Sequence, residues 1–216
     1  MSTTSTHATT TPVAIGTGRL LIAAASTGPV FFTVVLAQLA LRDGFDLRVH
    51  PISQLATGAA GWIQTTNFVL AGVGMLALAI AHRRLVRDGI GRRVVPILIA
   101  IFGLGLVIAG LFPMDPQYGF PVGTPTGPAP AMSWHSVVHS TAAALAYTAL
   151  AVACIVLVVR GVRRREVGAA IGNGLVALVL LLPMSPTESS LQIAANGVIT
   201  FAWAGAYALR LRRRGA

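Results

Sequence analysis

The chain has 216 residues, of which 55% are hydrophobic and only 10% are charged. Soluble globular domains carry about 25% charged residues, so this composition excludes a disordered chain and argues against a soluble enzyme. Sixteen basic residues, all of them arginine, outnumber six acids and give a net charge of +10. In a soluble protein this excess would suggest nucleic acid, so the positions of the arginines decide what it means.

Six apolar runs follow one another along the chain, and none contains an acidic residue, lysine or arginine. They are Leu20–Leu41, Gly61–His82, Val94–Pro113, Trp134–Val159, Val167–Met184 and Ser190–Leu209. About 20 helical residues cross the hydrocarbon layer, and backbone in lipid must form its own hydrogen bonds. We therefore predict an all-α, polytopic membrane protein. Its six-helix transmembrane domain occupies residues 19–210, between a mobile N-terminal tail at 1–18 and a basic C-terminal tail at 211–216.

The arginines predict the orientation of this bundle. Fourteen of the sixteen lie before the first run, between the second and third, between the fourth and fifth, or after the sixth. Only Arg42 and Arg48 fall on the other side. The positive-inside rule then places both termini in the cytoplasm, with the protein in the cell membrane. Arginine clusters beside membrane ends also attract anionic headgroups, so we expect membrane lipid, and no nucleic acid, as the partner. Assembly into an oligomer is left open.

The outward side is poor in arginine but holds three histidines and four acids, namely His50, His135, His139, Asp43, Asp46, Asp115 and Glu188. His135 and His139 have the i, i+4 spacing that places two side chains on one helix face. Two imidazoles so placed can bind one metal ion. The sequence thus predicts a zinc site in which His50, His135 and His139 are ligands. Asp115 would be a fourth ligand or would orient the water.

A metal-dependent hydrolase acting on a lipid-like substrate is one function consistent with this site, since bound zinc lowers the pKa of water to about 7. Ser53 or Glu188 would then assist proton transfer, with Asp115 and Ser53 as the catalytic residues. Asn67 and Asn196 lie a turn or two deeper, and we expect them to line the same cavity together with Glu188.

Several alternatives to the hydrolase stay open. The same residues could form a structural polar network, or a ligand or proton-relay site without metal. The protein could also be a non-enzymatic partner subunit or could bind a small hydrophobic ligand. A transporter is disfavoured because the six runs contain no acid or lysine to carry an ion. Haem is disfavoured because His135 and His139 share a face and cannot oppose each other.

Small residues in two of the runs predict close helix contacts, because they let backbones approach. Gly103, Gly105 and Gly110 lie in the third run, and the pattern Gly168-Ala-Ala-Ile-Gly172 lies in the fifth.

Four stretches of the chain resemble a known family. They are His50-Pro-Ile-Ser53, Asn67-Phe68 with Gly72, Phe112-Pro-Met-Asp-Pro116, and His135 to His139. In their order and spacing they look like the bacterial membrane family called domain of unknown function 998, over about residues 18–212. That resemblance implies about six helices and an integral membrane location, and it carries no established activity.

A more distant similarity is chemical. The alkaline ceramidase and adiponectin-receptor hydrolases hold zinc with three histidines, one aspartate and one serine, an inventory that His50, Ser53, Asp115, His135 and His139 match. This chain departs from that group because it has six predicted helices instead of seven. In addition, Ser53 follows the first histidine and the histidine pair opens the fourth helix.

Overall fold

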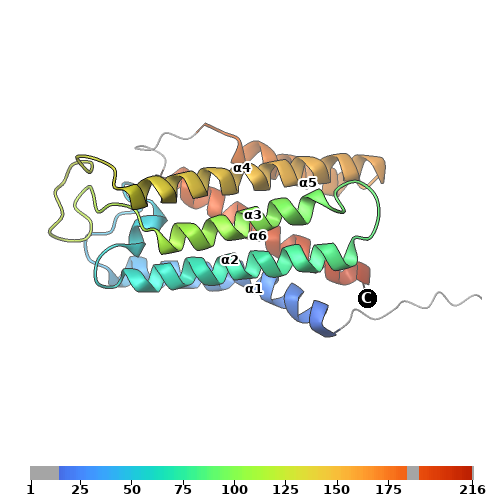
Figure 1. The fold of residues 1–216 in the computed structure, drawn as a ribbon, viewed down its shortest axis with the longest axis horizontal. Helices are drawn as coiled ribbons and strands as arrows, with labels where there is room; N and C mark the ends of the chain where they lie inside the picture. The colour runs from blue at the N-terminus through green and yellow to red at the C-terminus, as the bar shows by residue number, and fades with distance from the viewer. Residues whose placement is uncertain (1–14, 184–189, 216) are drawn as a thin grey trace, which may run out of the picture.

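The computed structural model describes residues 15–183 and 190–215. In chain order, its elements are α1 (Ile15–Leu41), the short 3₁₀ helix η1 (Ile52–Ala56), α2 (Gly61–Leu85), α3 (Val94–Leu111), α4 (Trp134–Arg163), α5 (Val167–Leu180) and α6 (Ser190–Gly215) (Figure 1). These ranges contain no strand, so the predicted all-α class and its six helices are confirmed. The helix α1 begins inside the segment expected to be a tail, and α6 continues to Gly215.

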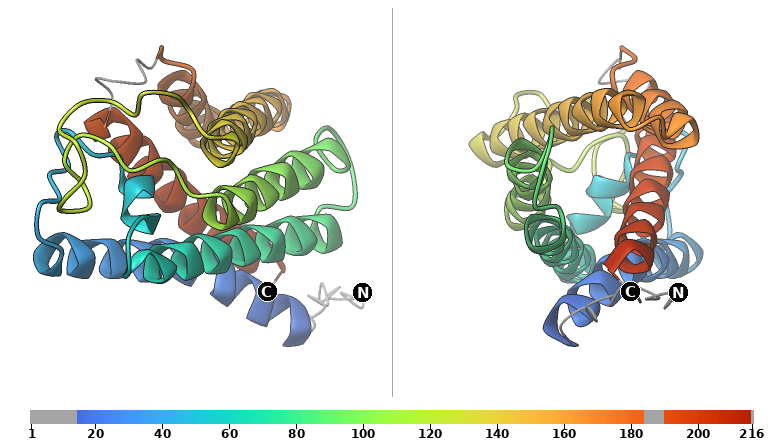
Figure 2. Two further views of the ribbon diagram at one scale, coloured as in Figure 1. Left: turned by 60° about the vertical axis from the view of Figure 1, so that its left-hand side comes forward. Right: turned by 90° about the vertical axis from the view of Figure 1, so that its right-hand side faces the viewer.

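The helices form a ring around a central core (Figure 2). Each helix from α1 to α4 packs against the next, and α6 returns to pack against α1. Contacts between α5 and α6 are sparse, and the described parts of α4 and α6 make very few. The helix η1 lies inside one end of the ring, where it contacts α2, α3 and α6. The wall of the bundle is therefore weakest where α6 faces α4 and α5.

Four of the helices, α1 to α4, are long and apolar enough to cross a membrane. The helix α5 has only 14 residues and extends about 21 Å at 1.5 Å per residue, which is short of the roughly 30 Å hydrocarbon layer. The helix α6 is less apolar because Gln192, Asn196 and Thr200 interrupt it. The multi-pass helical membrane fold is thus confirmed, and spanning by α5 and α6 stays a prediction.

Large apolar side chains cover the outside of these helices. Leu36, Leu70, Leu104 and Leu145 are each more than half exposed. Monomeric soluble proteins rarely expose large continuous apolar surfaces, so this exterior is suited to lipid. Trp62 and Trp134 are also exposed, at the starts of α2 and α4, where amphipathic rings are favoured at the membrane–water interface.

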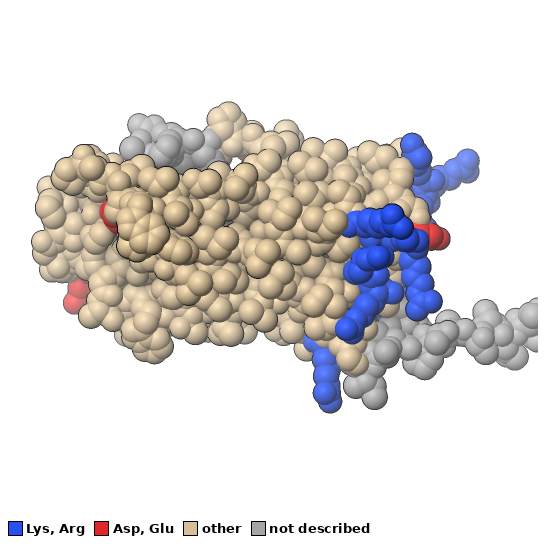
Figure 3. Space-filling model, viewed as in Figure 1, with Lys and Arg blue, Asp and Glu red and all other residues tan. Residues whose placement is uncertain are grey.

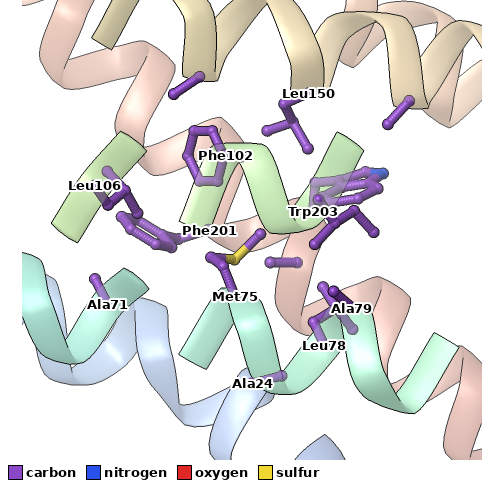
Figure 4. Close-up of a cluster of buried hydrophobic side chains, with 14 of the residues drawn as sticks. Ala24, Ala71, Met75, Leu78, Ala79, Phe102, Leu106, Leu150, Phe201 and Trp203 are labelled. Atoms are coloured by element: carbon purple, nitrogen blue, oxygen red, sulfur yellow. The ribbon is translucent and has the colours of Figure 1, made fainter. Parts of the chain in front are cut away.

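Glycines bring α2, α3 and α4 close together. A Cβ atom on Gly103 would lie 2.8 Å from the carbonyl oxygen of Gly72, and one on Gly105 would lie 2.6 Å from Cβ of Ala146. The contacts predicted for the third run are therefore confirmed, including Gly110, whose Cβ would lie 2.8 Å from Cβ of Phe68. Around this contact, apolar side chains such as those labelled in Figure 4 fill the core.

The prediction for the fifth run is wrong for its two glycines, although Ala170 within the same pattern packs closely against Gly161 of α4. A Cβ atom on Gly168 or Gly172 would meet no atom within 4 Å. Both glycines are exposed on α5, so they do not mediate a helix contact within this chain.

Charged residues divide the molecule into two ends. One end is formed by the α2–α3 connection, the α4–α5 connection and the last turns of α6, and we call it the arginine end. Figure 3 shows arginines, in blue, gathered toward this end, on the right of the view. We call the opposite end, formed by residues 42–60 and 114–133, the cap end. The cap end contains η1 and the predicted site residues His50, Ser53 and Asp115.

Candidate functional site

The cap end is built around the buried ring of Phe120. Its centroid lies 5.1 Å from that of Phe45 and 5.5 Å from that of His50, and the guanidinium of Arg42 lies 4.7 Å from it. Gly119, at φ +83°, allows the tight turn that brings Phe120 inward. The loop 114–133 therefore folds back over the bundle and contacts the loop that precedes η1.

Side-chain donors then tie these two loops together through backbone carbonyls. The amide Nε2 of Gln54 donates to Gln117 O at 2.7 Å and to Phe120 O at 3.1 Å. The guanidinium of Arg42 instead donates within residues 42–60, to Leu55 O and Thr57 O, and it meets the other loop at the ring of Phe120. Sequence reasoning missed Gln54 and Arg42 as organising residues. The only available signal was that both are long donor side chains beside a short buried loop.

His50 belongs to this set of ties. Its Nδ1 accepts from the N–H of Asp46 at 2.9 Å, and its Nε2 lies 2.9 Å from Tyr118 O. Because Nδ1 accepts a hydrogen bond and a carbonyl cannot donate one, Nε2 carries the proton. Both ring nitrogens are used, and the side chain is buried. His50 therefore joins two loops and has no lone pair free for the metal predicted from the sequence.

Asp115 also has a backbone partner. Its Oδ2 accepts from the N–H of Ser133 at 2.8 Å, and the hydroxyl of Ser133 caps α4 by accepting from the N–H of Ser136. The carboxylate thus anchors the far end of the loop 114–133 to the start of α4.

The two histidines of the predicted pair lie in different surroundings. His135 is exposed and stacks on the indole of Trp134, with ring centroids 3.7 Å apart. His139 is buried, and its Nδ1 lies 2.8 Å from Ala109 O and 3.1 Å from Phe112 O. Nδ1 therefore carries the proton, and Nε2 is left as an acceptor with no partner among the described residues.

His139 lines a small cavity of about 70 Å³ inside the bundle, which we call the His139 cavity. Residues of α1, η1, α2, α3, α4 and α6 surround it, namely Phe31, Ile52, Ser53, Phe68, Gly105, Leu106, Ala109, His139, Ala143, Ala146, Tyr147, Ile193, Gly197 and Phe201. The lining is apolar except for Ser53, His139 and the hydroxyl of Tyr147. The structure thus brings Ser53 and His139 to one cavity. The other residues that the sequence had grouped with them, His50, His135 and Asp115, do not line it.

Ser53 does not act on His139 in the structure. Its hydroxyl donates to Sδ of Met114 at 2.9 Å. A nucleophile and its base need a hydrogen bond of about 2.6–3.2 Å, and none joins these two side chains among the described contacts. The cavity therefore resembles a binding site more than a catalytic dyad.

The remaining predicted residues lie elsewhere. Asn67 donates to Phe31 O at 3.1 Å and to Gln64 Oε1 at 3.2 Å, and Gln64 also accepts from Gln38 at 2.8 Å. This polar cluster joins α1 to α2. Asn67 and the buried Asn196 are not among the residues that line the His139 cavity. Glu188 lies outside the described residues.

Residues 15–183 and 190–215 contain no group of three or more His, Cys, Asp or Glu side chains placed to hold one metal ion. The reason is the hydrogen bonding described above, because His50 and Asp115 bind backbone atoms while His135 turns outward. The predicted zinc site has no support from this arrangement.

The fold and its lipid-suited exterior define a multi-pass, all-α integral membrane protein. Residues 10–213 match the model of the family described as "Protein of unknown function (DUF998)". The chain belongs to this family, as its four characteristic stretches indicated. No curated protein and no solved structure matches it.

Proposed function

We propose that this protein binds a lipid-like amphiphile, with part of its apolar chain in the His139 cavity and its polar group against His139 and Ser53. The observation that carries the proposal is the chemistry of the cavity lining. An apolar chamber with a few convergent polar groups is the usual form of a small-molecule site. Here the polar acceptor is Nε2 of His139, held in place because Nδ1 is bonded to two carbonyls.

The cavity is accessible from the side of the bundle. Ala143 and Tyr147 on α4 and Ile193 on α6 line it and are half-buried, whereas most other lining residues are buried. These three residues lie where α4 and α6 make few contacts. The neighbouring Leu145 and Val198 are exposed apolar residues, so an acyl chain can enter from lipid without crossing the cap end.

The size of the cavity limits what enters it. Sites that enclose drug-sized ligands measure about 300–1,000 Å³, and the His139 cavity measures about 70 Å³. It therefore accepts only a short segment of chain, and the rest of the ligand lies between α4 and α6. With the arginine end in the cytoplasm, as the positive-inside rule favours, the ligand comes from the outer leaflet.

A pair of tryptophan substitutions tests this proposal. Ala143→Trp fills the mouth of the cavity, whereas Ala144→Trp places the same ring on the exposed face of α4. The purified full chain in lipid nanodiscs is labelled with a diazirine-bearing palmitate, and labelled peptides are mapped by mass spectrometry. We expect labelling of α4 and α6 to fall at least about fivefold in Ala143→Trp and to stay unchanged in Ala144→Trp. Equal labelling of both variants would overturn the proposal.

A second pair of substitutions tests the roles of the two ring nitrogens of His139 one at a time. In His139→Asn the amide can still donate to Ala109 O and Phe112 O, but nothing replaces Nε2. The opposite change, His139→Gln, reaches toward the Nε2 position and leaves those carbonyls without their donor. We expect His139→Asn to keep its melting temperature and lose labelling, and His139→Gln to lose stability. Full labelling of a stable His139→Asn variant would remove His139 from the site.

A further inference from the structure

A second cavity lies at the arginine end, with a volume of about 230 Å³. Its walls come from the end of α2 and the connection that follows, from α4 and α5 with their connection, and from α6. Five arginines line it, Arg87, Arg160, Arg164, Arg210 and Arg214, against only two acids. We call it the arginine pocket. It holds an excess of three positive charges, contributed by three separate parts of the chain.

The two acids hold these arginines in place without neutralising them. Asp88 Oδ1 lies 2.6 Å from Arg164 and 3.6 Å from Arg160. The carboxylate of Glu166 pairs with Arg210 at 2.5 Å and with Arg214 at 2.6 Å. Each guanidinium carries five N–H donors, so most of them remain available. The side chain of Arg87 has no hydrogen-bond partner among the described residues.

The inner wall of the arginine pocket offers little competing chemistry. Leu85, Leu157 and Leu211 make it largely apolar. Its polar groups are already engaged, since the hydroxyl of Tyr207 lies 2.7 Å from Nδ1 of His82 and Asn173 accepts from the indole of Trp203. The unused hydrogen-bonding capacity of the pocket is therefore cationic, and it is suited to an anion.

Membrane topology alone does not account for this arrangement. The positive-inside rule requires arginines on one side of the membrane, and Arg83, Arg163 and Arg213 meet it without lining the pocket. Convergence of five guanidiniums on one cavity is a further property. Planar guanidinium groups bind phosphate oxygens in pairs, and several of them match the charge of a phosphate better than that of a single carboxylate.

We propose that the arginine pocket binds a phosphate group, carried by an anionic lipid headgroup or by a soluble phosphate compound. The site is independent of the His139 cavity, which lies toward the other end of the bundle. The apolar inner wall is suited to the glycerol and first methylenes of a lipid, and the exposed rim is suited to a soluble compound.

Two probes applied to the purified, delipidated full chain distinguish these sources. Inorganic phosphate is titrated calorimetrically in a phosphate-free detergent buffer. Dioleoyl phosphatidic acid is compared with dioleoylglycerol, which lacks the phosphate, by native mass spectrometry. Saturable binding of phosphatidic acid alone supports a headgroup site, and saturable binding of inorganic phosphate supports a site for soluble compounds. If neither probe binds saturably, the proposal is overturned.

Matched variants test whether the binding belongs to this pocket. The double variant Arg87→Gln with Arg210→Gln removes two positive charges from the arginine pocket. The control, Arg83→Gln with Arg213→Gln, removes two positive charges from α2 and α6 at positions that do not line the pocket. We expect affinity to fall at least about tenfold in the first and less than about twofold in the second. Arg87→Gln alone breaks no described side-chain contact, so it tests the site even if the double variant folds poorly, with an expected loss of about threefold. Equal losses in pocket and control variants would overturn the proposal.

Discussion

At the cap end, side chains of Arg42, His50 and Gln54 bind backbone carbonyls, and the loops close over a buried phenylalanine. At the arginine end, side chains bind one another across helices, through the paired acids Asp88 and Glu166. The first arrangement engages its side-chain donors, leaves Oε1 of Gln54 without a partner among the described residues, and has a small apolar chamber beneath it. The second leaves cationic donors unused around a larger cavity. A count of polar residues at each end would miss this difference, because it depends on which groups already have partners.

The comparison of the two ends can be tested by substitution, and we expect the largest change in the free energy of unfolding at His50. His50→Leu leaves the N–H of Asp46 and the carbonyl of Tyr118, both on half-buried residues, without their partner, and each lost bond costs about 1–3 kcal/mol. We expect a loss of about 3 kcal/mol in the free energy of unfolding, measured by denaturant titration in detergent. The exposed His135 provides the control, because His135→Leu should change stability by no more than about 0.5 kcal/mol.

At the arginine end, the most buried arginine is expected to have the next largest effect. The side chain of Arg160 is 11% exposed and donates to Asp88 O and Ile90 O, each at 2.8 Å. Arg160→Met keeps the apolar stem and removes two charge-assisted bonds, so we expect a loss of about 2 kcal/mol. The same substitution at the exposed Arg163 should cost no more than about 0.5 kcal/mol. Similar losses at both positions would show that the two arginines are equivalent.

Glu166 is expected to show a smaller effect that depends on pH. Partial burial raises the pKa of this carboxyl, but the hydrogen bond from Arg214 and the charges of Arg214, Arg210 and Arg164 outweigh it and hold the pKa below its usual value. A lowered pKa in the folded state stabilises the protein above the unfolded value of about 4.3. That stability is lost as the pH falls through the folded value. We expect Glu166→Gln to cost about 0.5–1 kcal/mol at pH 7.

Thermal melting of both proteins across the acid range checks the pH dependence of Glu166. The stabilities of Glu166→Gln and the unsubstituted protein should converge as the pH falls below about 4. A difference that persists at low pH would show that the substitution acts through packing and not through the ion pairs.

The smallest effect belongs to the exposed ion pair of the cap end. The side-chain and backbone hydrogen bonds from Arg48 lower the pKa of Asp46 to about 2. This pair joins two neighbours in one loop, so it should matter for titration and little for folding. We expect Arg48→Gln to raise the pKa of Asp46 toward about 3.9, measured by carboxyl NMR titration. Arg212→Gln, at the other end of the molecule, should leave it unchanged.

Much of the fold could be predicted from the sequence, because the length of an apolar run limits where a membrane helix starts and ends. Trp134 was predicted to open the fourth helix and does so. Gly105 and Gly168 show where this reasoning stops. Spacing tells which small residues share a face, but only the packed structure tells which face meets a neighbour.

The site was harder to predict, because the role of each residue depends on hydrogen bonds to backbone atoms that are distant in the sequence. The sequence predicts that His50 and His139 lie on the same side of the membrane. It does not show that Tyr118 O would occupy one nitrogen of His50, or that Ala109 O and Phe112 O would orient the ring of His139. Gln54 offered only a long donor side chain as a signal, and its role appears only when the loop 114–133 is folded above it.

The ties between residues 42–57 and residues 117–120 also set an order of assembly. The donors on His50 and Gln54 are synthesised long before the carbonyls of Gln117, Tyr118 and Phe120 exist. During biogenesis the cap end must therefore stay open until α3 has been placed and the following loop has emerged beside η1. Closure of the cap end thus follows the synthesis of α3, while α4, α5 and α6 are still to come.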